Sequence, residues 1–230
     1  MSSVFVFLQV GREVDIPELF VRSLRKHNPD ARIIQCSDPN SAAIPGVDEV
    51  RRLDGDCANL MTFRLQCFAE QAPNEPALYL DRDMICMRAI DPEALTGPHH
   101  VGVCKREFAT GELFNASLFG MDLAEYAGKS MGEVYPYVAC ATATIGPRFW
   151  KDCLANLMTL DPKFHFCYGD QEAIRNIVQS ERYGVRFLRE SIYARLPEAL
   201  GQSLDQPKFV HFKGRWRKPL MLEWASRFGL

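Results

Sequence analysis

Apolar and polar positions follow strand and helix periods along most of the chain. Residues 4–10, VFVFLQV, form a short run of β-branched and aromatic residues that predicts a buried strand. Apolar residues then recur at helical spacing over residues 15–30, which predicts a helix. Residues 31–38, ARIIQCSD, predict a second strand. A strand, a helix and a strand at the start of a chain indicate an α/β fold.

The same alternation continues after this first unit. Residues 57–72 predict an amphipathic helix, and residues 77–81, ALYLD, predict a third strand that is apolar like a central parallel strand. Four more strands are expected, at residues 99–107, 111–122 (after a Thr110-Gly111 turn), 185–191 and 208–214, and two more helices, at 146–160 and 169–180. We therefore expect a single α/β domain over residues 1–230, with a mixed, mainly parallel central sheet flanked by helices.

Composition narrows the class of protein. The net charge of -2 over 230 residues argues against general nucleic-acid binding, which usually shows a basic balance or patch. The 8 cysteines include no C-x-x-C pair, so we expect reduced core thiols rather than a zinc site or a disulfide framework. The first residues lack the pattern of a signal peptide, and no apolar run reaches the ~20 residues of a membrane span. These features predict a cytoplasmic protein.

Two carboxylates interrupt an apolar run in the segment ALYLDRDMICM. Asp81 and Asp83 are two residues apart, so in a strand they point to the same side, whereas Arg82 points away and is expected to pair with the surrounding structure. At the carboxyl end of a parallel strand both aspartates would reach the crevice where open α/β sheets bind ligands. Mg²⁺ or Mn²⁺ commonly joins such carboxylates to a substrate phosphate. The alternative is an acidic turn without a ligand.

A second candidate lies in the segment KFVHFKGRWRKPL. His211 falls in an expected strand, and a neutral imidazole can complete the coordination of a metal ion. Gly214 permits close backbone approach to a phosphate, and Lys218 could neutralise one together with Arg215 or Arg217. The alternative is a structural histidine followed by a solvated basic loop.

Three further positions have a structural and a functional interpretation. Asn115, among apolar neighbours, either satisfies the backbone or faces a polar ligand. Asp170 and Gln171 open the helix expected at 169–180, where they either cap it or face a sugar. Arg64 either reaches a diphosphate or is a solvated helix residue.

The order of these motifs resembles nucleotide-sugar glycosyltransferases of the GT-A, Rossmann-like fold. An apolar strand ending in D-x-D, an F-N-A segment, G-D-Q at a helix start, and H-F-x-G followed by K-P run in that order from about Val4 to Leu220. The likeness is strongest to the retaining group that includes glycogenin and bacterial lipopolysaccharide galactosyltransferases. The resemblance implies transfer of a hexose from a nucleoside-diphosphate sugar, UDP by preference, to a saccharide, glycolipid or other hydroxyl acceptor.

The resemblance also implies a role for each residue. Asp81, Asp83 and His211 would hold Mn²⁺, or Mg²⁺ in its place. Arg64, Asn115, Gly214 and Lys218 would contact the donor or its diphosphate, with Asn115 also open to the acceptor. Asp170 and Gln171 would lie beside the reacting anomeric carbon. The family's first strand commonly ends in an Asp near a Tyr that help to hold the base, and this chain reads FLQVGREVD there.

Two other functions remain open at this stage. A nucleotidyltransferase also uses carboxylate-held metal, but it predicts a glycine- and lysine-rich loop after the first strand, where QVGREVD has one glycine and no lysine. A protein that binds nucleotide sugars without turnover is the non-enzymatic alternative. The C-terminal segment GRWRKPLMLEWASRFGL is expected to pack over the active site, with weak contact to the inner face of a membrane as the alternative.

Overall fold

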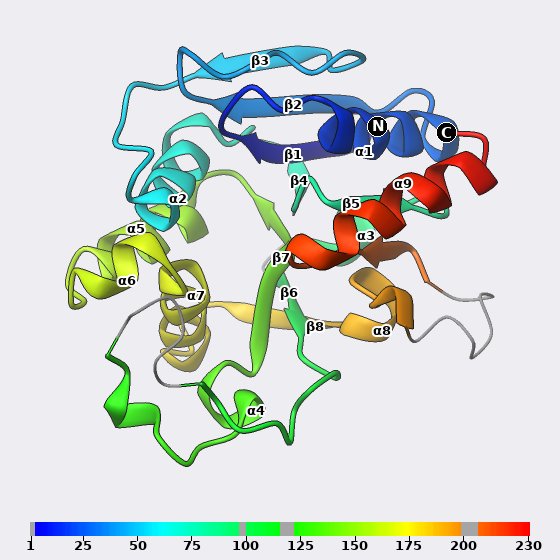
Figure 1. The fold of residues 1–230 in the computed structure, drawn as a ribbon. Helices are drawn as coiled ribbons and strands as arrows, with labels where there is room; N and C mark the ends of the chain where they lie inside the picture. Colours follow the sequence, from blue (N-terminus) through cyan, green and yellow to red (C-terminus); the bar gives the residue numbers. More distant parts are fainter. Residues whose placement is uncertain (1–2, 97–99, 116–121, 199–206) are drawn as a thin grey trace.

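A central seven-stranded sheet organises the molecule (Figure 1). The computed structural model describes residues 3–96, 100–115, 122–198 and 207–230. The strands of this sheet run in the order β3-β2-β1-β4-β7-β6-β8. Their bounds are β1 Val4–Gln9, β2 Arg32–Ser37, β3 Glu49–Arg52, β4 Pro76–Leu80, β6 His100–Lys105, β7 Tyr137–Ile145 and β8 Gly184–Arg189. Only β7 runs against its neighbours, so the sheet is mixed and mainly parallel, as predicted.

A second, two-stranded sheet lies next to the end of β4. It pairs β5 (Met84–Cys86) with β9 (Phe209–His211) in antiparallel register, with Met84 opposite His211. The strand expected at 208–214 therefore exists, but it belongs to this small sheet. This pairing brings two distant parts of the chain together at the place where β4 ends.

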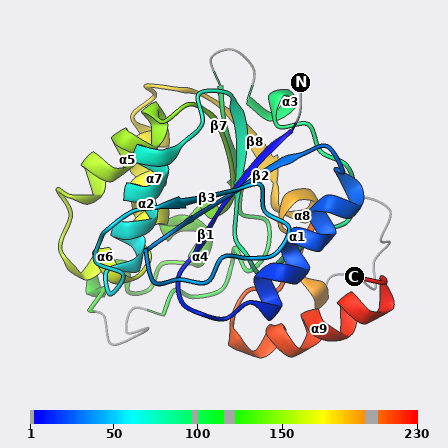
Figure 2. The same cartoon turned by 90° about the horizontal axis from the view of Figure 1, so that it is seen from above.

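Helices cover both faces of the central sheet, as Figure 2 shows. On one side lie α2 (Leu60–Gln71), α5 (Arg148–Leu157), α6 (Lys163–Phe166) and α7 (Gly169–Gln179), and on the other lie α1 (Asp15–His27), α8 (Glu190–Tyr193) and α9 (Lys218–Arg227). The remaining short helices are α3 (Glu93–Thr96), α4 (Met131–Val134), η2 (Ala124–Tyr126) and η4 (Arg215–Arg217). The long helices agree with the pattern, although α2 begins at Leu60 rather than at Cys57.

Alternation along β1 divides the apolar interior into two cores. Val4 and Val6 face the core under α2, α5 and α7, whereas Phe5 and Phe7 face the core under α1 and α9. All four side chains are essentially inaccessible to solvent. Complete burial of such a side chain stabilises a fold by about 1.5–3 kcal/mol. Residues 4–7 of β1 are thus apolar on both faces, as a central strand covered by helices requires.

The prediction of a strand at 111–122 was wrong for the part of that segment that the structure describes. In its described part, residues 111–115, only Leu113 makes an isolated bridge, to Ser130, and residues 116–121 lie outside the described residues. The strand between β4 and β6 in the sheet is β7, which the sequence pattern did not reveal. Residues 138–144 of β7 are all buried, and periodicity alone does not distinguish a short strand buried on both faces from a buried helix segment.

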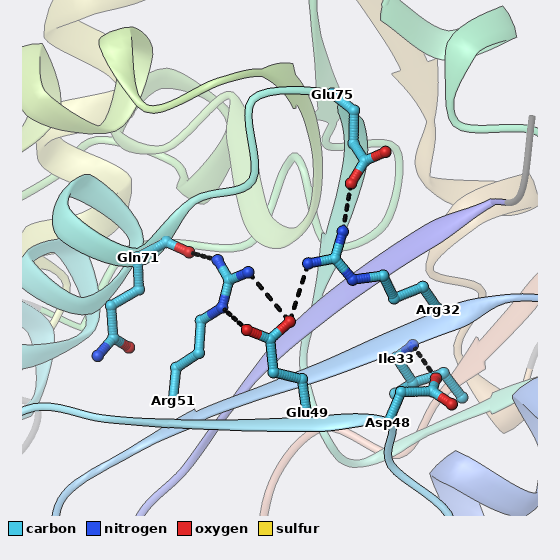
Figure 3. Close-up of polar contacts among 7 residues, drawn as sticks. All are labelled: Arg32, Ile33, Asp48, Glu49, Arg51, Gln71 and Glu75. Atoms are coloured by element: carbon cyan, nitrogen blue, oxygen red, sulfur yellow. Dashed lines mark hydrogen bonds and ion pairs between the residues drawn. The ribbon is translucent and has the colours of Figure 1, made fainter.

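The edge strand β3 was also not predicted, and ion pairs hold it in place (Figure 3). The carboxylate of Glu49 lies between two guanidinium groups, with Arg51 Nε 2.7 Å from Oε1 and Arg32 Nη2 2.9 Å from Oε2. Arg32 also pairs with Glu75, and Arg51 donates to the Gln71 carbonyl at the end of α2. These contacts compensate for the polar sequence EVRR, which gives β3 little apolar surface to bury.

Helix α9 packs on the body of the protein beside α1. Met221 and Ala225 are buried, and the Trp224 ring meets Phe212 edge-on with centroids 5.7 Å apart. Lys26 of α1 donates to the Phe228 carbonyl. The inward position of Trp224 supports the expectation of a packed helix. None of the helices within the described residues has the length and apolar character needed to cross a membrane.

Candidate active site

Asp81, Asp83 and His211 converge at the end of β4. The two aspartates lie in the bend between β4 and β5, not within the strand as the sequence suggested. His211 Nε2 nevertheless lies 3.3 Å from Asp83 Oδ1 and 3.7 Å from Asp81 Oδ2. The pairing of β5 with β9 explains this, because it places the last residue of β9 opposite the first residue of β5.

Basic groups shift the ionisation of this corner. Burial would raise the pKa of Asp83, but His211 and Lys218 outweigh it and lower that pKa below its ordinary range. Burial would lower the pKa of His211, but Cys140 and Asp83 outweigh it and raise that pKa to about 10. A metal ion binds the neutral imidazole, so a bound ion would oppose this rise.

Arg64 joins three elements at the site. One guanidinium nitrogen lies 2.9 Å from Asp81 Oδ1 and also donates to the Ala139 carbonyl of β7, at 3.0 Å. The other nitrogen lies 3.2 Å from Asp170 Oδ2 on α7. The side chain is only 11% exposed, so it is not the solvated helix residue that was the alternative. A buried arginine between two carboxylates fixes α2, β4 and α7 relative to one another.

The start of α7 places Asp170 and Gln171 near Arg64. A Cβ on Gly169 would lie 2.1 Å from the Phe164 carbonyl oxygen, so only glycine allows this approach to α6. Asp170 lies in the first turn rather than at the cap, is buried, and accepts from the Gln171 backbone N–H at 2.8 Å. Burial raises the pKa of Asp170, and the nearby Arg64 opposes that rise. Gln171 Oε1 accepts from Arg106, at 3.1 Å.

Lys218 and Gly214 occupy the segment after His211. Lys218 Nζ lies 3.0 Å from Asp83 Oδ2. Gly214 is exposed and has a φ of +87°, in the left-handed region that favours glycine. The segment thus brings its lysine to Asp83, and the contact of Gly214 and Lys218 with a diphosphate stays a prediction. Asn115 is exposed and directly precedes residues 116–121, and its ligand role stays a prediction.

Three residues near the site were not found from the sequence. Cys140 of β7 lies beside His211, and Ala139 supplies the carbonyl that Arg64 meets. Arg106, which follows β6, is buried and donates to the Tyr135 carbonyl as well as to Gln171. Cys140 and Ala139 lie in β7, which the sequence pattern did not reveal. The only signal for Arg106 is its position near the end of the strand expected at 99–107.

All eight cysteines are free, as predicted. Cys57 and Cys167 are partly exposed, and the others are buried. Cys140 differs from an ordinary core thiol because its neighbours are polar. A hydrogen bond with Cys104 and burial raise the pKa of the Cys140 thiol, whereas His211 opposes that rise.

A hollow of about 210 Å³ adjoins the carboxylates at the carboxyl ends of β1 and β4. It is smaller than the ~300–1,000 Å³ of most small-molecule pockets, so it suits one part of an elongated ligand. Its walls combine apolar and charged residues: Leu8, Val10, Leu60, Met61 and Leu80, with Arg64, Asp81, Arg82 and Asp83. A larger hollow of about 590 Å³, lined by Ser3, Ala31 and Lys208 among others, lies at the opposite ends of these strands.

The end of β1 lacks the acidic base contact of the resembled family. Gln9 is buried, and its amide donates to the carbonyls of Gly11, at 3.1 Å, and Glu13, at 2.9 Å. Its Oε1 accepts from Arg82, which also pairs with Glu13. Arg82 therefore pairs with the surrounding structure, as expected. The side chain of Gln9 is fully engaged within the protein.

The donor set at the corner fits a divalent cation. His211 Nε2 lies within 3.7 Å of a carboxylate oxygen of each aspartate, and the His211 side chain is almost completely buried. Carboxylate oxygens suit Mn²⁺ and Mg²⁺, and an imidazole extends the set toward transition metals.

The fold is that of known glycosyltransferase structures. The chain matches no protein-family model and no curated protein sequence. Two crystal structures of the galactosyltransferase LgtC align with 97% of this chain and 95% of their own. One is a complex with donor and acceptor sugar analogs, at 14% identity and a TM-score of 0.59. The other is an active-site mutant, at 17% identity and a TM-score of 0.60.

At these identities the likeness establishes the fold. The chain has the GT-A fold over nearly its whole length, which the order of its motifs had predicted. The solved structures that it resembles include the galactosyltransferase LgtC.

Proposed function

We propose that the chain is a metal-dependent glycosyltransferase that moves a hexose from a nucleoside-diphosphate sugar to a hydroxyl acceptor. The observation that carries the proposal is the convergence of Asp81, Asp83 and His211 at the carboxyl end of a parallel strand in a GT-A fold. Open α/β sheets bind their ligands at this end of the strands. A solved neighbour with this fold is a complex with donor and acceptor sugar analogs, which supports the same two substrate classes here.

The charged side chains suit a diphosphate leaving group. Asp81, Asp83 and His211 would hold Mn²⁺ or Mg²⁺, which would act as a Lewis acid toward the charge that grows on the diphosphate. Lys218 would transfer its interaction from Asp83 to a phosphate oxygen and add a second positive charge. The loss of one such electrostatic contact typically lowers a rate by ~10²–10³.

The hollow at the end of β1 is proposed as the nucleoside site. Leu8, Val10 and Met61 offer apolar surface for a base, and Arg82 lines the same hollow. The base would be held by packing and backbone groups, because the side chain of Gln9 is engaged elsewhere. UDP remains the expected nucleotide on the strength of the resemblance alone.

Asp170 and Gln171 are proposed to face the reacting sugar. Asp170 is held by Arg64, and Gln171 by Arg106, so both side chains have fixed positions. With retention of configuration, these groups would support the positive charge that develops at the anomeric carbon. With inversion, Asp170 would have to remove the acceptor proton. The resemblance to the retaining group favours the first outcome.

A donor screen with two variants tests the proposal. The unmodified chain is heated with UDP-, GDP-, ADP- and dTDP-sugars, with and without Mn²⁺, and the release of nucleoside diphosphate is measured with an added saccharide acceptor. We expect metal-dependent protection and release by the unmodified chain. Asp83→Ala should abolish both, while its folded structure remains, because the backbone carbonyl of Asp83 still accepts from Phe212. The exposed Glu223→Gln variant should behave like the unmodified chain.

The screen also separates the alternatives. Full metal-dependent turnover by Asp83→Ala would overturn the metal assignment. Protection without release or transfer would identify a nucleotide-sugar-binding protein. Release of pyrophosphate from a nucleoside triphosphate would identify a nucleotidyltransferase.

A further inference from the structure

Cys140 brings a sulfur atom to the corner formed by Asp81 and His211. The sulfur, one His211 nitrogen and one Asp81 carboxylate oxygen all lie within 4.8 Å of one another. Within the described residues, no other three side chains of the types His, Cys, Asp and Glu form such a group. Cys140 is 4% exposed, and its thiol interacts with Cys104, His211 and Arg64.

We infer that Cys140 is a thiolate ligand of the divalent ion held by Asp81 and His211, and that it gives this centre a preference for Zn²⁺ and Co²⁺ over Mn²⁺ and Mg²⁺. The inference rests on the proposed function in placing a metal ion at this corner. It goes beyond that function because an oxygen-rich D-x-D site with one histidine requires no sulfur.

The backbone fixes Cys140 and Asp81 side by side. The Asp81 N–H donates to the Cys140 carbonyl, at 3.1 Å, directly after the paired residues Leu80 and Ala141 of β4 and β7. His211 is held from its own side, because its N–H donates to the Arg195 carbonyl, at 2.8 Å. The three ligand atoms thus come from positions anchored by strand hydrogen bonds, and sites on such elements are more precise than sites on loops.

The nitrogen–oxygen separations suit two ligands of one ion, and the sulfur lies within 4.8 Å of His211 and Asp81. Zinc binds sulfur at about 2.3 Å and nitrogen or oxygen at about 2.0–2.2 Å, so two ligands of one tetrahedral ion lie roughly 3.3–3.7 Å apart. His211 Nε2 lies 3.7 Å from Asp81 and 3.3 Å from Asp83. Thiolate and imidazole ligands favour zinc and similar ions, whereas Mn²⁺ and Mg²⁺ favour oxygen.

The charges around the corner also favour a thiolate. Arg64 already balances Asp81, and Lys218 already balances Asp83. Asp170 shares Arg64 with Asp81, so these three carboxylates face two cations. With a neutral imidazole, a divalent ion bound to neutral sulfur would leave one net positive charge among these groups, and a thiolate would cancel it. On binding, the S–H bond breaks, the sulfur–metal bond forms, and the proton passes to solvent.

Cobalt binding to the reduced full-length chain tests the inference. The probe is Co²⁺ alone, without nucleotide, because a cobalt–thiolate bond gives a near-ultraviolet charge-transfer absorption. We expect that absorption in the unmodified chain and its loss in Cys140→Ala and Cys140→Ser. We also expect the ratio of Zn²⁺ to Mn²⁺ affinity to fall at least about tenfold in both variants, a change that corresponds to about 1.4 kcal/mol.

Cys104→Ala is the matched control. Cys104 is a buried thiol that forms a hydrogen bond with Cys140 but does not belong to the group of ligand atoms. This variant should keep the cobalt absorption. Circular dichroism of each variant shows that it is folded, and Cys140→Ser keeps the size of the side chain if Cys140→Ala does not fold.

Three results would overturn the inference. The first is that the unmodified chain shows no charge-transfer absorption. The second is that the folded Cys140 variants show the same absorption as the unmodified chain. The third is that these variants lose Zn²⁺ and Mn²⁺ affinity equally, without a change in absorption. The last result would mean that Cys140 only orients His211. If the absorption fails but the chain still transfers sugar with Mn²⁺, the proposed function stands without the sulfur ligand. If the absorption appears without any sugar transfer, the ligand stands without that function.

Discussion

Lys218 Nζ lies 3.0 Å from Asp83 Oδ2, so the first residue of α9 is tied to the bend that follows β4. This contact joins the two sequence motifs that carried the resemblance. It also means that a lysine and a proposed metal ion share one carboxylate. The same side chain can therefore bind Asp83 in one arrangement and a donor phosphate in another.

Replacement of Lys218 should separate these two roles. In Lys218→Ala we expect sugar transfer to fall ~10²–10³-fold, because one positive charge near the leaving diphosphate is lost. Mn²⁺ affinity should stay the same or increase, because Asp83 loses a competing cation. Turnover and Mn²⁺ titrations measure the two effects. Arg227→Ala, at the exposed far end of the same helix, is the control. Unchanged turnover in Lys218→Ala would remove Lys218 from the proposed site.

Arg64 should matter for stability as well as for activity. In Arg64→Met the partly buried Asp81 and the buried Asp170 lose their shared cation, and breaking such a pair typically costs about 3–5 kcal/mol. Urea unfolding at pH 7 measures this loss. The double variant Arg64→Met/Asp170→Asn should recover part of the free energy of unfolding. If the effects of the two single substitutions simply add, the ion pair does not couple the two residues.

Asp170→Asn should lower activity while stability stays equal or increases. Burial raises the pKa of Asp170 in the folded chain, although Arg64 opposes this, so ionisation opposes folding as the pH rises through that pKa. The asparagine keeps an oxygen for the Gln171 N–H and has no charge to bury. We expect the unfolding temperature of the unmodified chain to rise relative to the variant as the pH falls from neutral toward the ordinary pKa of an aspartate.

Turnover of the Asp170→Asn variant is measured on the same samples. Loss of both turnover and stability would assign Asp170 a structural role. Loss of turnover alone would agree with a position beside the reacting sugar. Asn176→Asp, on a later turn of the same helix, tests whether any change of charge on α7 has the same effect.

Much of the fold and part of the site could be predicted because the signals are local. Short apolar runs predict β1, β2 and β4, and the D-x-D motif directly follows the run of β4. His211 could be connected with Asp83 only through the order of motifs, since the β5–β9 pairing that joins them leaves no mark in either segment. Local pattern thus indicates the elements, but not which distant elements pair.

The failures have the same physical origin. β7 is buried on both faces and follows a strand-like segment at 111–115 that does not enter the sheet, so Cys140 was assigned to the core and not to the site. Conversely, β3 is too polar to look like a strand, and its stability depends on arginines that pair across three segments. In both cases the determining contacts come from other elements.

The ion-pair group around Glu49 gives a stability prediction that is independent of the active site. Hydrogen bonds from Arg51 and Arg32 lower the pKa of Glu49 to about 2, so its contribution to stability is present above the ordinary pKa and declines as the pH falls toward 2. Because the side chain is 38% exposed, we expect Glu49→Gln to cost only about 1 kcal/mol at pH 7. Urea unfolding of both proteins at pH 7 and pH 3 measures the difference, which should shrink at pH 3.

Glu223→Gln, on exposed α9 surface and without an ion pair among the described residues, should show no difference at either pH. An equal cost for Glu49→Gln at both pH values would mean that shape, rather than charge, makes Glu49 important to β3.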